Sequence, residues 1–138
     1  MSKTSCRGII IKDNAILLVK RVLYKKIFYV LPGGTVEEGE TFEETLTREV
    51  KEETNCTVEI VEFLFQLNSK AAQRISRIYL CNYIEGTPEL RKDSVEYDRQ
   101  SKKNKYIPTW YPLMQIFKIN ILPKEVKDYL LQNYILKV

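Results

Sequence analysis

Three glutamates, Glu49, Glu52 and Glu53, lie close together in a segment that has the sequence pattern of a helix. Thr41 with Glu44 three residues later forms a capping box, which predicts that a helix begins at Thr41. Glu49 and Glu53 are four residues apart, so they are neighbours on one side of that helix and repel each other. Hard divalent cations such as Mg²⁺ bind to oxygen ligands and would offset this repulsion. The three glutamates therefore predict a metal site.

The apolar residues of this helix indicate which way the carboxylates point. At about 100° per residue, Phe42, Leu46 and Val50 form one stripe that should face the core. Glu49 and Glu53 fall on the same side, and Glu52 flanks them, so charge is predicted where burial would be costly without a cation. The opposite, solvent-facing side carries Glu43, Glu44, Thr47 and Lys51. A merely solvated acidic helix is the alternative interpretation.

The charge of the chain is unevenly distributed. Of 18 acidic residues in 138, ten lie between Glu37 and Glu62, where only Arg48 and Lys51 are basic, although the net charge of the whole chain is +4. An acidic patch in an otherwise basic protein would suit cations in the patch and phosphates beside it.

Composition and length predict one globular domain, residues 1–138, with 44% hydrophobic and 29% charged residues. No apolar run approaches the ~20 residues that span a bilayer, and Met1 to Arg7 is not an apolar leader, so we expect a cytoplasmic protein. Cys6, Cys56 and Cys81 are odd in number and widely spaced, which predicts buried reduced thiols rather than disulfides or a zinc site.

Strands are predicted where β-branched and aromatic residues gather between turn residues. The predicted strands are Cys6 to Ile11, Ala15 to Lys20, Ile27 to Leu31, Thr57 to Gln66, Arg74 to Ile84 and Thr109 to Tyr111. Pro32, Gly33 and Gly34 break the chain before the acidic helix, and Asn55 should end that helix. Further predictions are a long loop from Glu85 to Ile107, a short helix from Leu113 to Phe117 and a closing helix from Pro123 to Tyr134.

A wider frame contains the glutamates: Gly34, then Glu40, then the run Arg48 to Cys56. This frame resembles the Nudix box, G-x5-E-x7-R-E-U-x-E-E-x-G-U with U apolar, except that Asn55 replaces the second glycine. Because Asn is the non-glycine residue that most readily adopts the left-handed conformation, the turn should be preserved. The preceding VLPGGTVEEGET is also similar to the family, and the stretch Trp110 to Leu113 carries a weaker likeness.

The resemblance implies an α/β (α+β) fold, in which an α/β/α sandwich encloses a mixed β-sheet. It also implies Mg²⁺, for which Mn²⁺ can substitute, and substrates with a diphosphate linked to another moiety. The metal ligands it implies are Glu49, Glu52, Glu53 and the backbone carbonyl of Gly33. Glu49 would orient or deprotonate the attacking water, Arg48 would hold the carboxylates in position, and Glu40 would brace the loop. The implied catalytic residues are Glu49, Arg48 and Glu52.

Other parts of the site are less well defined by the sequence. An acid outside the box is expected as a further ligand, with Glu96 preferred over Glu89, Asp93 and Asp98. Substrate contacts are expected from Arg7, Arg21, Gly34 and Trp110, with Tyr29 and the basic run Lys102 to Lys105 as further candidates. Since the chain has no histidine, a carboxylate or a hydroxide on the metal would have to take the proton from water.

The predicted function is metal-dependent hydrolysis of a phosphoanhydride bond in a nucleoside di- or triphosphate or a nucleoside diphosphate-linked compound. Two alternatives stay open: a catalytically weak domain that binds a nucleotide or a protein, and an enzyme acting on RNA 5′ ends. The expected partner is a small nucleotide-type substrate, no membrane is expected, and a homodimer is left open. Neither the substrate nor the phosphorus attacked follows from the sequence.

Overall fold

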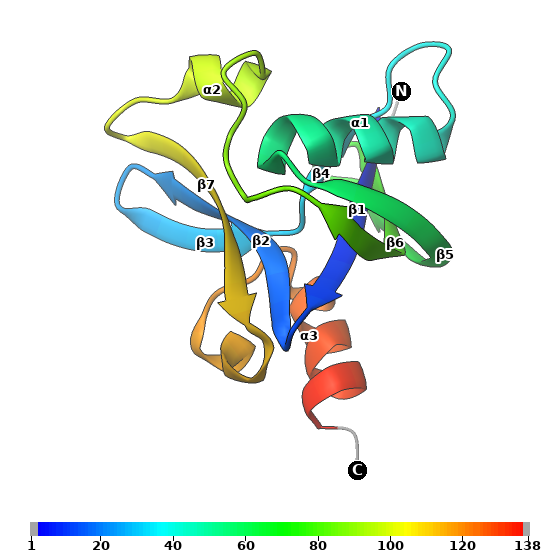
Figure 1. The fold of residues 1–138 in the computed structure, drawn as a ribbon, viewed down its shortest axis with the longest axis vertical. Coiled ribbons are helices and arrows are strands. Elements are labelled where there is room, and N and C mark those ends of the chain that lie inside the picture. The colour runs from blue at the N-terminus through cyan, green and yellow to red at the C-terminus, as the bar shows by residue number, and fades with distance from the viewer. Residues whose placement is uncertain (1–2, 137–138) are drawn as a thin grey trace.

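The computed structural model describes residues 3–136, so the two outermost residues at each end of the expected domain lie outside it (Figure 1). The strands are β1 (Lys3–Lys12), β2 (Ala15–Leu23), β3 (Lys26–Val30), β4 (Gly33–Thr35), β5 (Thr57–Ser69), β6 (Arg74–Glu85) and β7 (Asn104–Pro112). The helices are α1 (Phe42–Thr54), α2 (Val95–Arg99), the 3₁₀ helix η1 (Leu113–Lys118), α3 (Lys124–Leu130) and the π-helical turn η2 (Leu131–Ile135).

The sheet is mixed, as predicted. Strand β1 runs parallel to β6, and the other strand pairs are antiparallel in the order β3-β2-β1-β6-β5, with β4 on β1 and β7 on β2. Strands β1 and β2 pair only next to their connecting turn, at Ile11 with Ile16 and Lys12 with Ala15. Beyond that turn β1 pairs with β4 and β6, whereas β2 pairs with β3 and β7, so the strands form two groups.

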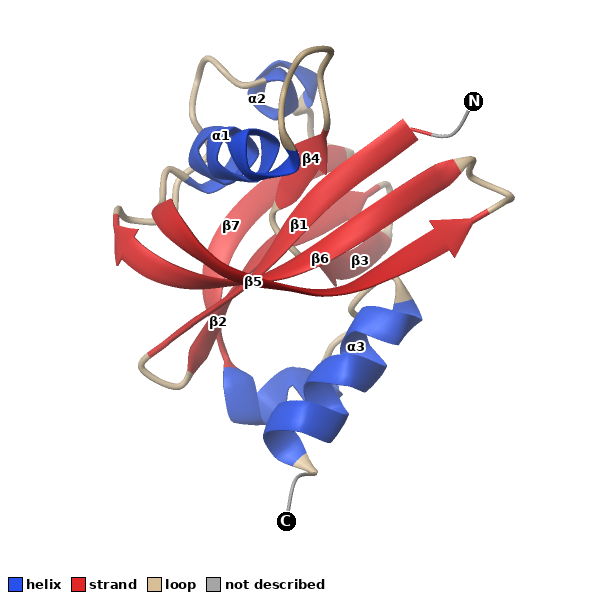
Figure 2. Cartoon of the chain, turned by 90° about the vertical axis from the view of Figure 1, so that its right-hand side faces the viewer, coloured by secondary structure: helices blue, strands red, loops and turns tan. Residues whose placement is uncertain are grey.

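Helices cover opposite faces of these strands (Figure 2). One core cluster includes Ile10 and Leu17 with Leu46 and Val50 of α1. The other gathers under η1 and α3, and its members include Ile9, Ile16, Leu18, Ile116, Val126 and Leu130. Because neighbouring residues of a strand point to opposite faces, consecutive apolar residues in β1 and β2 fill both clusters. The α/β/α sandwich is therefore confirmed.

Two further sequence predictions concern cysteines and membranes. Cys6, Cys56 and Cys81 are buried and free, as predicted. Within residues 3–136, no helix has the length and apolar character needed to cross a membrane.

Four predictions of local structure were wrong in detail. Pro32, Gly33 and Gly34 were predicted to break the chain, but Gly33 and Gly34 begin β4, which pairs with β1. The predicted loop from Glu85 to Ile107 contains α2 and the first residues of β7, which pairs with β2 over its full length. That part of β7 is polar, so its sequence did not show a strand. The closing helix changes from α-helical to π-helical hydrogen bonding after Leu130. Phe42 was predicted to face the core but is 38% exposed, because it is the first residue of α1 and the core does not extend that far along the helix. Its ring packs against Arg77, whose guanidinium carbon lies 4.4 Å from the ring centre.

Candidate active site

The acidic helix α1 begins and ends as its sequence predicts. The Thr41 hydroxyl accepts from the Glu44 N–H at 3.1 Å, and the Glu44 carboxylate accepts from the Thr41 N–H at 2.9 Å. At the other end Asn55 has φ 63°, the left-handed conformation of a helix cap. Local sequence thus fixes which turn of the helix carries the glutamates.

Glu53 is the most deeply buried of the box carboxylates, with 5% of its surface exposed. It accepts a hydrogen bond of 3.1 Å from the Gly33 N–H. The pKa of Glu53 is raised to about 8, chiefly by desolvation and in part by the nearby charges of Glu96 and Glu49, against opposing contributions from Arg7 and the Gly33 N–H. A cation at this carboxylate would stabilise its charged form.

Glu49 is partly protected from the same effect. Its burial raises its pKa, while the Arg48 guanidinium, 2.7 Å away, opposes the rise. Arg48 also donates two hydrogen bonds to Glu40, of 2.7 and 2.8 Å, and one of 3.3 Å to Glu52. Hydrogen bonding to Arg48 holds the pKa of Glu40 down to about 2. One arginine therefore ties the carboxylates of α1 to the loop before it.

The glycines before α1 leave space that the site needs. A Cβ on Gly34 would lie 2.3 Å from the Glu49 Oε2. A Cβ on Gly33 would lie 2.0 Å from the Cys6 carbonyl oxygen, and Gly33 has φ +148°. A side chain is thus excluded at Gly34 by the Glu49 carboxylate and at Gly33 by the backbone of β1.

Glu49 and Glu53 face a cavity of about 470 Å³ between the two strand groups. Its charged lining comprises the glutamates Glu37, Glu49, Glu53 and Glu96 and the arginines Arg7, Arg21, Arg74 and Arg99. Val30, Gly33, Gly34, Thr35 and Tyr106 complete the wall. The cavity therefore places groups suited to cations opposite groups suited to phosphates.

Hydrogen bonds to the backbone and to neighbouring side chains hold the arginines in place. Arg7 donates to the Leu31 carbonyl at 2.8 Å, and Arg74 donates to the hydroxyls of Ser5 and Thr35. Arg21 donates to the Asn104 side chain at 2.7 Å, and its guanidinium carbon lies 3.8 Å from the centre of the Tyr106 ring. Among these side-chain contacts no carboxylate takes part, so these guanidinium groups keep charge for an anion.

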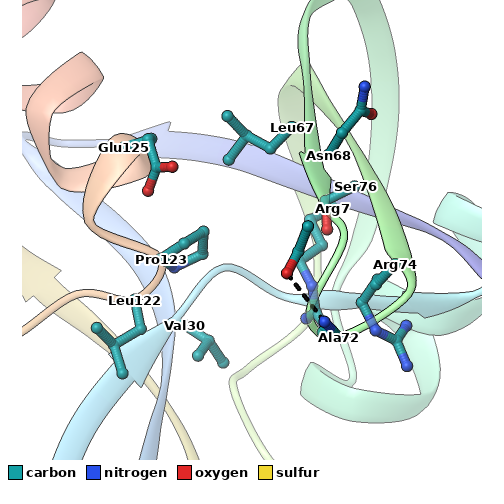
Figure 3. A pocket seen from close by; sticks show the side chains of 11 residues that line it. Arg7, Val30, Leu67, Asn68, Ala72, Arg74, Ser76, Leu122, Pro123 and Glu125 are labelled. Atoms are coloured by element: carbon teal, nitrogen blue, oxygen red, sulfur yellow. Dashed lines mark hydrogen bonds between the residues drawn. The ribbon is translucent and has the colours of Figure 1, made fainter.

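A second cavity, of about 580 Å³, adjoins the first and shares Arg7, Val30 and Arg74 with it (Figure 3). Apolar side chains from β5 and from the segment before α3 line it, namely Leu67, Leu122 and Pro123. Polar groups lie among them: Asn68, Ser69, Ser76 and Glu125. An apolar surface with a few polar groups is typical of a pocket for an organic moiety.

The structure brings some of the predicted site residues together and separates others. Those that line the first cavity are Arg7, Arg21, Gly33, Gly34, Glu49, Glu53 and Glu96. Glu52 is half-buried beside Arg48 and does not line it. Tyr29 and Trp110 pack against the core, Trp110 edge-to-face with Tyr83 at 5.4 Å, so neither is placed to stack on a ligand in this cavity. Lys102 to Lys105 also lie outside the lining.

Sequence reasoning missed Arg74, Arg99 and Tyr106 as lining residues. Tyr106 reaches the cavity because β7 pairs with β2 in a register that places it opposite Arg21. Arg74 reaches it because β6 runs parallel to β1 and places it opposite Lys3. Nothing in the local sequence of these residues indicates either pairing.

The donor chemistry of the cavity fits a hard divalent cation. Within the described residues no three acidic, cysteine or histidine side chains are already clustered as a metal site. Glu53 and Glu49 have one oxygen each engaged by the Gly33 N–H and by Arg48. The second oxygen of each carboxylate stays available, and carboxylate oxygens are the ligands that Mg²⁺ prefers. Glu49, Glu53 and Glu96 would hold it.

Comparison with known proteins agrees with this picture. The family model described as NUDIX domain matches residues 3–131. An ADP-ribose pyrophosphatase of Methanocaldococcus jannaschii is 34% identical over 127 residues, covering 88% of this chain and 65% of the relative. An NAD-capped RNA hydrolase, NudC, of Vibrio atlanticus is 33% identical over 75 residues, covering 54% of this chain and 28% of the relative. The chain thus spans less than two thirds of the length of either relative.

A solved NUDIX hydrolase from Nitrosomonas europaea shares the fold, with a TM-score of 0.72 at 18% identity over 96% of this chain and 72% of that one. The family match and the shared fold agree over nearly the whole described chain. The protein belongs to the NUDIX domain family.

Proposed function

We propose that the protein hydrolyses a phosphoanhydride bond in a nucleoside di- or triphosphate or a nucleoside diphosphate-linked compound, with Mg²⁺ or Mn²⁺. One observation carries the proposal: the buried Glu53 and the half-buried Glu49 face the same cavity as four arginines. The names of the two relatives, an ADP-ribose pyrophosphatase and an NAD-capped RNA hydrolase, point to the same class of bond.

Each side of the cavity has a distinct task in this proposal. The bound cation would supply charge neutralisation of the diphosphate and acidify a water. The guanidinium groups of Arg7, Arg21 and Arg74 would hold the phosphate oxygens, for which their planar donor pairs are suited. Glu49 would orient or deprotonate the attacking water, while Arg48 fixes the direction of its carboxylate through the 2.7 Å hydrogen bond.

The adjoining cavity of about 580 Å³ is the proposed seat of the nucleoside. It meets the catalytic cavity at Arg7, Val30 and Arg74, so a phosphate at those arginines would have its nucleoside next to Leu67 and Pro123 (Figure 3). Asn68 and Glu125 would supply hydrogen bonds to polar groups on the base or sugar.

The test is a substrate panel with Mg²⁺ or Mn²⁺: nucleoside triphosphates, nucleotide sugars, ADP-ribose, dinucleoside polyphosphates and RNA with a capped or triphosphorylated 5′ end. We expect turnover of at least one class and a loss of orders of magnitude in Glu53→Gln, which removes the charge of a metal ligand at nearly constant volume. Glu43→Gln, on the exposed side of the same helix, is the matched control and should retain full activity.

Two outcomes would contradict the proposal. Folded protein that turned over none of the panel would favour a domain that only binds a nucleotide or protein partner. Undiminished turnover in Glu53→Gln would remove Glu53 from the metal site, even if the enzyme were active.

A further inference from the structure

The tip of the β2–β3 hairpin carries a basic surface next to, but outside, the catalytic cavity. Leu23, Tyr24, Lys25, Lys26 and Lys103 line a depression there of about 660 Å³. The Tyr24 N–H donates to the Lys103 carbonyl, which joins the hairpin to the turn before β7. Tyr24 is 70% exposed, a high value for an aromatic side chain. We name this surface, defined by Tyr24, Lys25, Lys26 and Lys103, the lysine tip.

No acidic residue belongs to the chain segments that form the lysine tip. Residues 15–36 and 99–112 contain eight lysines and arginines and no aspartate or glutamate. Pairing of β7 with β2 brings the two segments together, and no ion pair involves the lysines of the tip within residues 3–136. Positive charge therefore accumulates there without an internal partner, as in surfaces that bind polyanions.

The lysine tip and the catalytic cavity share one face of the β3-β2-β7 strands. Arg21 lies opposite Phe28 and Tyr106, and two residues further along the same face Leu23 lies opposite Lys26 and Asn104. Val30 of β3 lines the cavity and Lys26 lines the tip, four residues apart and hence about 13 Å along the strand. The Arg21–Tyr106 stack lies between them, so a ligand that leaves the cavity in this direction passes Arg21 before it reaches the lysines of the tip.

We propose that the lysine tip binds single-stranded RNA whose 5′ end, bearing the phosphoanhydride, occupies the catalytic cavity; this rests on the proposed function. The RNA chain would leave past the Arg21–Tyr106 stack, and the adjoining cavity would be left for a nucleoside cap. A phosphodiester chain presents a charge at each step, which matches a row of basic groups that runs from Arg21 at the cavity to the lysines of the tip. Tyr24 provides a face on which a base can stack without sequence preference, the usual accompaniment of such a path. RNA is favoured because its chains start from a nucleoside triphosphate and so retain a phosphoanhydride at the 5′ end.

The reaction on such a substrate is balanced by water alone. The water oxygen would form a bond to one phosphorus of the 5′ phosphoanhydride while the bridging P–O bond breaks, and the leaving phosphate would keep the electron pair. One proton of the water would pass to solvent through Glu49. The products would be RNA with a shortened 5′ phosphate and the released phosphate compound.

Binding can be tested apart from hydrolysis, in EDTA, with a fluorescent ten-nucleotide RNA that carries a 5′ triphosphate. Each lysine–phosphate contact adds ~0.7 to the slope of log affinity against log salt for a single strand. We therefore expect the triple variant Lys25→Gln, Lys26→Gln, Lys103→Gln to reduce that slope by about 2. Lys12→Gln, Lys118→Gln, Lys127→Gln removes the same charge at the end of the molecule that carries the β1–β2 turn and α3, and should leave the slope nearly unchanged (Figure 1).

The aromatic contribution has its own variant pair. Tyr24→Ala should weaken binding roughly tenfold, since a stacked base is lost, and Tyr24→Phe should bind like the unmodified protein. Because binding is measured in EDTA, where no turnover is expected, its outcome separates failure of this inference from failure of the proposed hydrolysis.

Three results would overturn the inference: no measurable RNA binding, equal loss of slope in both triple variants, or no effect of Tyr24→Ala. Polyglutamate of equal charge would also overturn the inference, in favour of an acidic protein partner, if it competed with the RNA equally well in the unmodified protein and in Tyr24→Ala.

Discussion

The two walls of the catalytic cavity are encoded in different ways. The centre of its carboxylate wall comes from α1, where Glu49 and Glu53 are four residues apart, and Glu37 and Glu96 flank it from outside that helix. Its arginine wall comes from four separate elements, because Arg7, Arg21, Arg74 and Arg99 belong to β1, β2, β6 and α2. Helix periodicity therefore defines the first wall, whereas strand pairing assembles the second.

The walls should also differ in their tolerance of change. Glu53 and Glu49 accept hydrogen bonds from the Gly33 N–H and from Arg48, and a Cβ on Gly34 would lie 2.3 Å from the Glu49 Oε2, so small changes there would move a carboxylate. The arginines share one task among four side chains, so the loss of one leaves three. We expect small steric changes beside the carboxylates to cost more activity than the complete removal of a single arginine.

Among the variants that compare the two walls, the largest effect is expected from Gly34→Ala. The new Cβ would lie 2.3 Å from the Glu49 Oε2, so Glu49 must move and its hydrogen bond with Arg48 must be remade. A shift of about 1 Å in a catalytic group can cost ~100-fold in rate, and we expect a loss of that order in kcat. Steady-state kinetics on the substrate found in the panel would measure it.

Gly39→Ala is the control for this experiment. Gly39 also precedes α1 and has φ +84°, so alanine strains its backbone, but nothing lies within 4 Å of the added Cβ. It should lower the unfolding temperature slightly and leave kcat unchanged. An equal fall of kcat in both variants would mean that loop conformation, rather than the position of Glu49, limits the reaction.

A smaller effect is expected on the other wall, from Arg74→Ala. Losing one charge-assisted hydrogen bond of roughly 1.5–3 kcal/mol to a phosphate should raise KM about tenfold or more, with a smaller change of kcat. Arg77→Ala is matched to it, because Arg77 lies on the same strand but stacks on Phe42 and Phe63 outside the cavity. If Arg77→Ala raised KM as much as Arg74→Ala, the arginine wall would not be the phosphate site.

Much of α1 could be predicted from sequence because its signals are local. The capping box, the inward direction of Glu49 and Glu53 and the left-handed cap at Asn55 depend on residues within one segment. The error at Phe42 has a related cause, because periodicity tells which side of a helix is apolar but not how far the core extends along it.

The arginine wall could be predicted only in part, because it depends on pairings between distant strands. Arg7 and Arg21 were proposed as phosphate ligands, but a lone arginine such as Arg74 is indistinguishable in sequence from any solvated one. The β6–β1 pairing that places it spans about half the chain. Trp110 shows the opposite error: its type suited base stacking, but the register of β7 turns it toward the core under α1.

Removal of metal should reveal the cost of burying Glu53. Its pKa is about 8 in the folded chain and ~4.3 when unfolded, so the contribution of Glu53 to stability is full below about pH 4 and is lost as the pH rises from there to about 8. In EDTA, Glu53→Gln should therefore unfold several degrees above the unmodified protein at pH 8 and within about a degree of it at pH 4. Calorimetry at both pH values measures the difference. If Glu53→Gln were less stable at pH 8, the burial of this charge would have no such cost.

The smallest effect concerns the helix cap that ends the carboxylate wall. Asn55 has φ 63°, and its side-chain amide donates to the Thr87 carbonyl at 3.2 Å. Asn55→Gly loses that exposed hydrogen bond but relieves the left-handed backbone, so its free energy of unfolding should lie within about 0.5 kcal/mol of the unmodified protein. Asn55→Ala loses both advantages and should cost about 1 kcal/mol in urea denaturation. Equal stability of the two variants would mean that the Thr87 contact, rather than backbone conformation, explains why this position accepts asparagine.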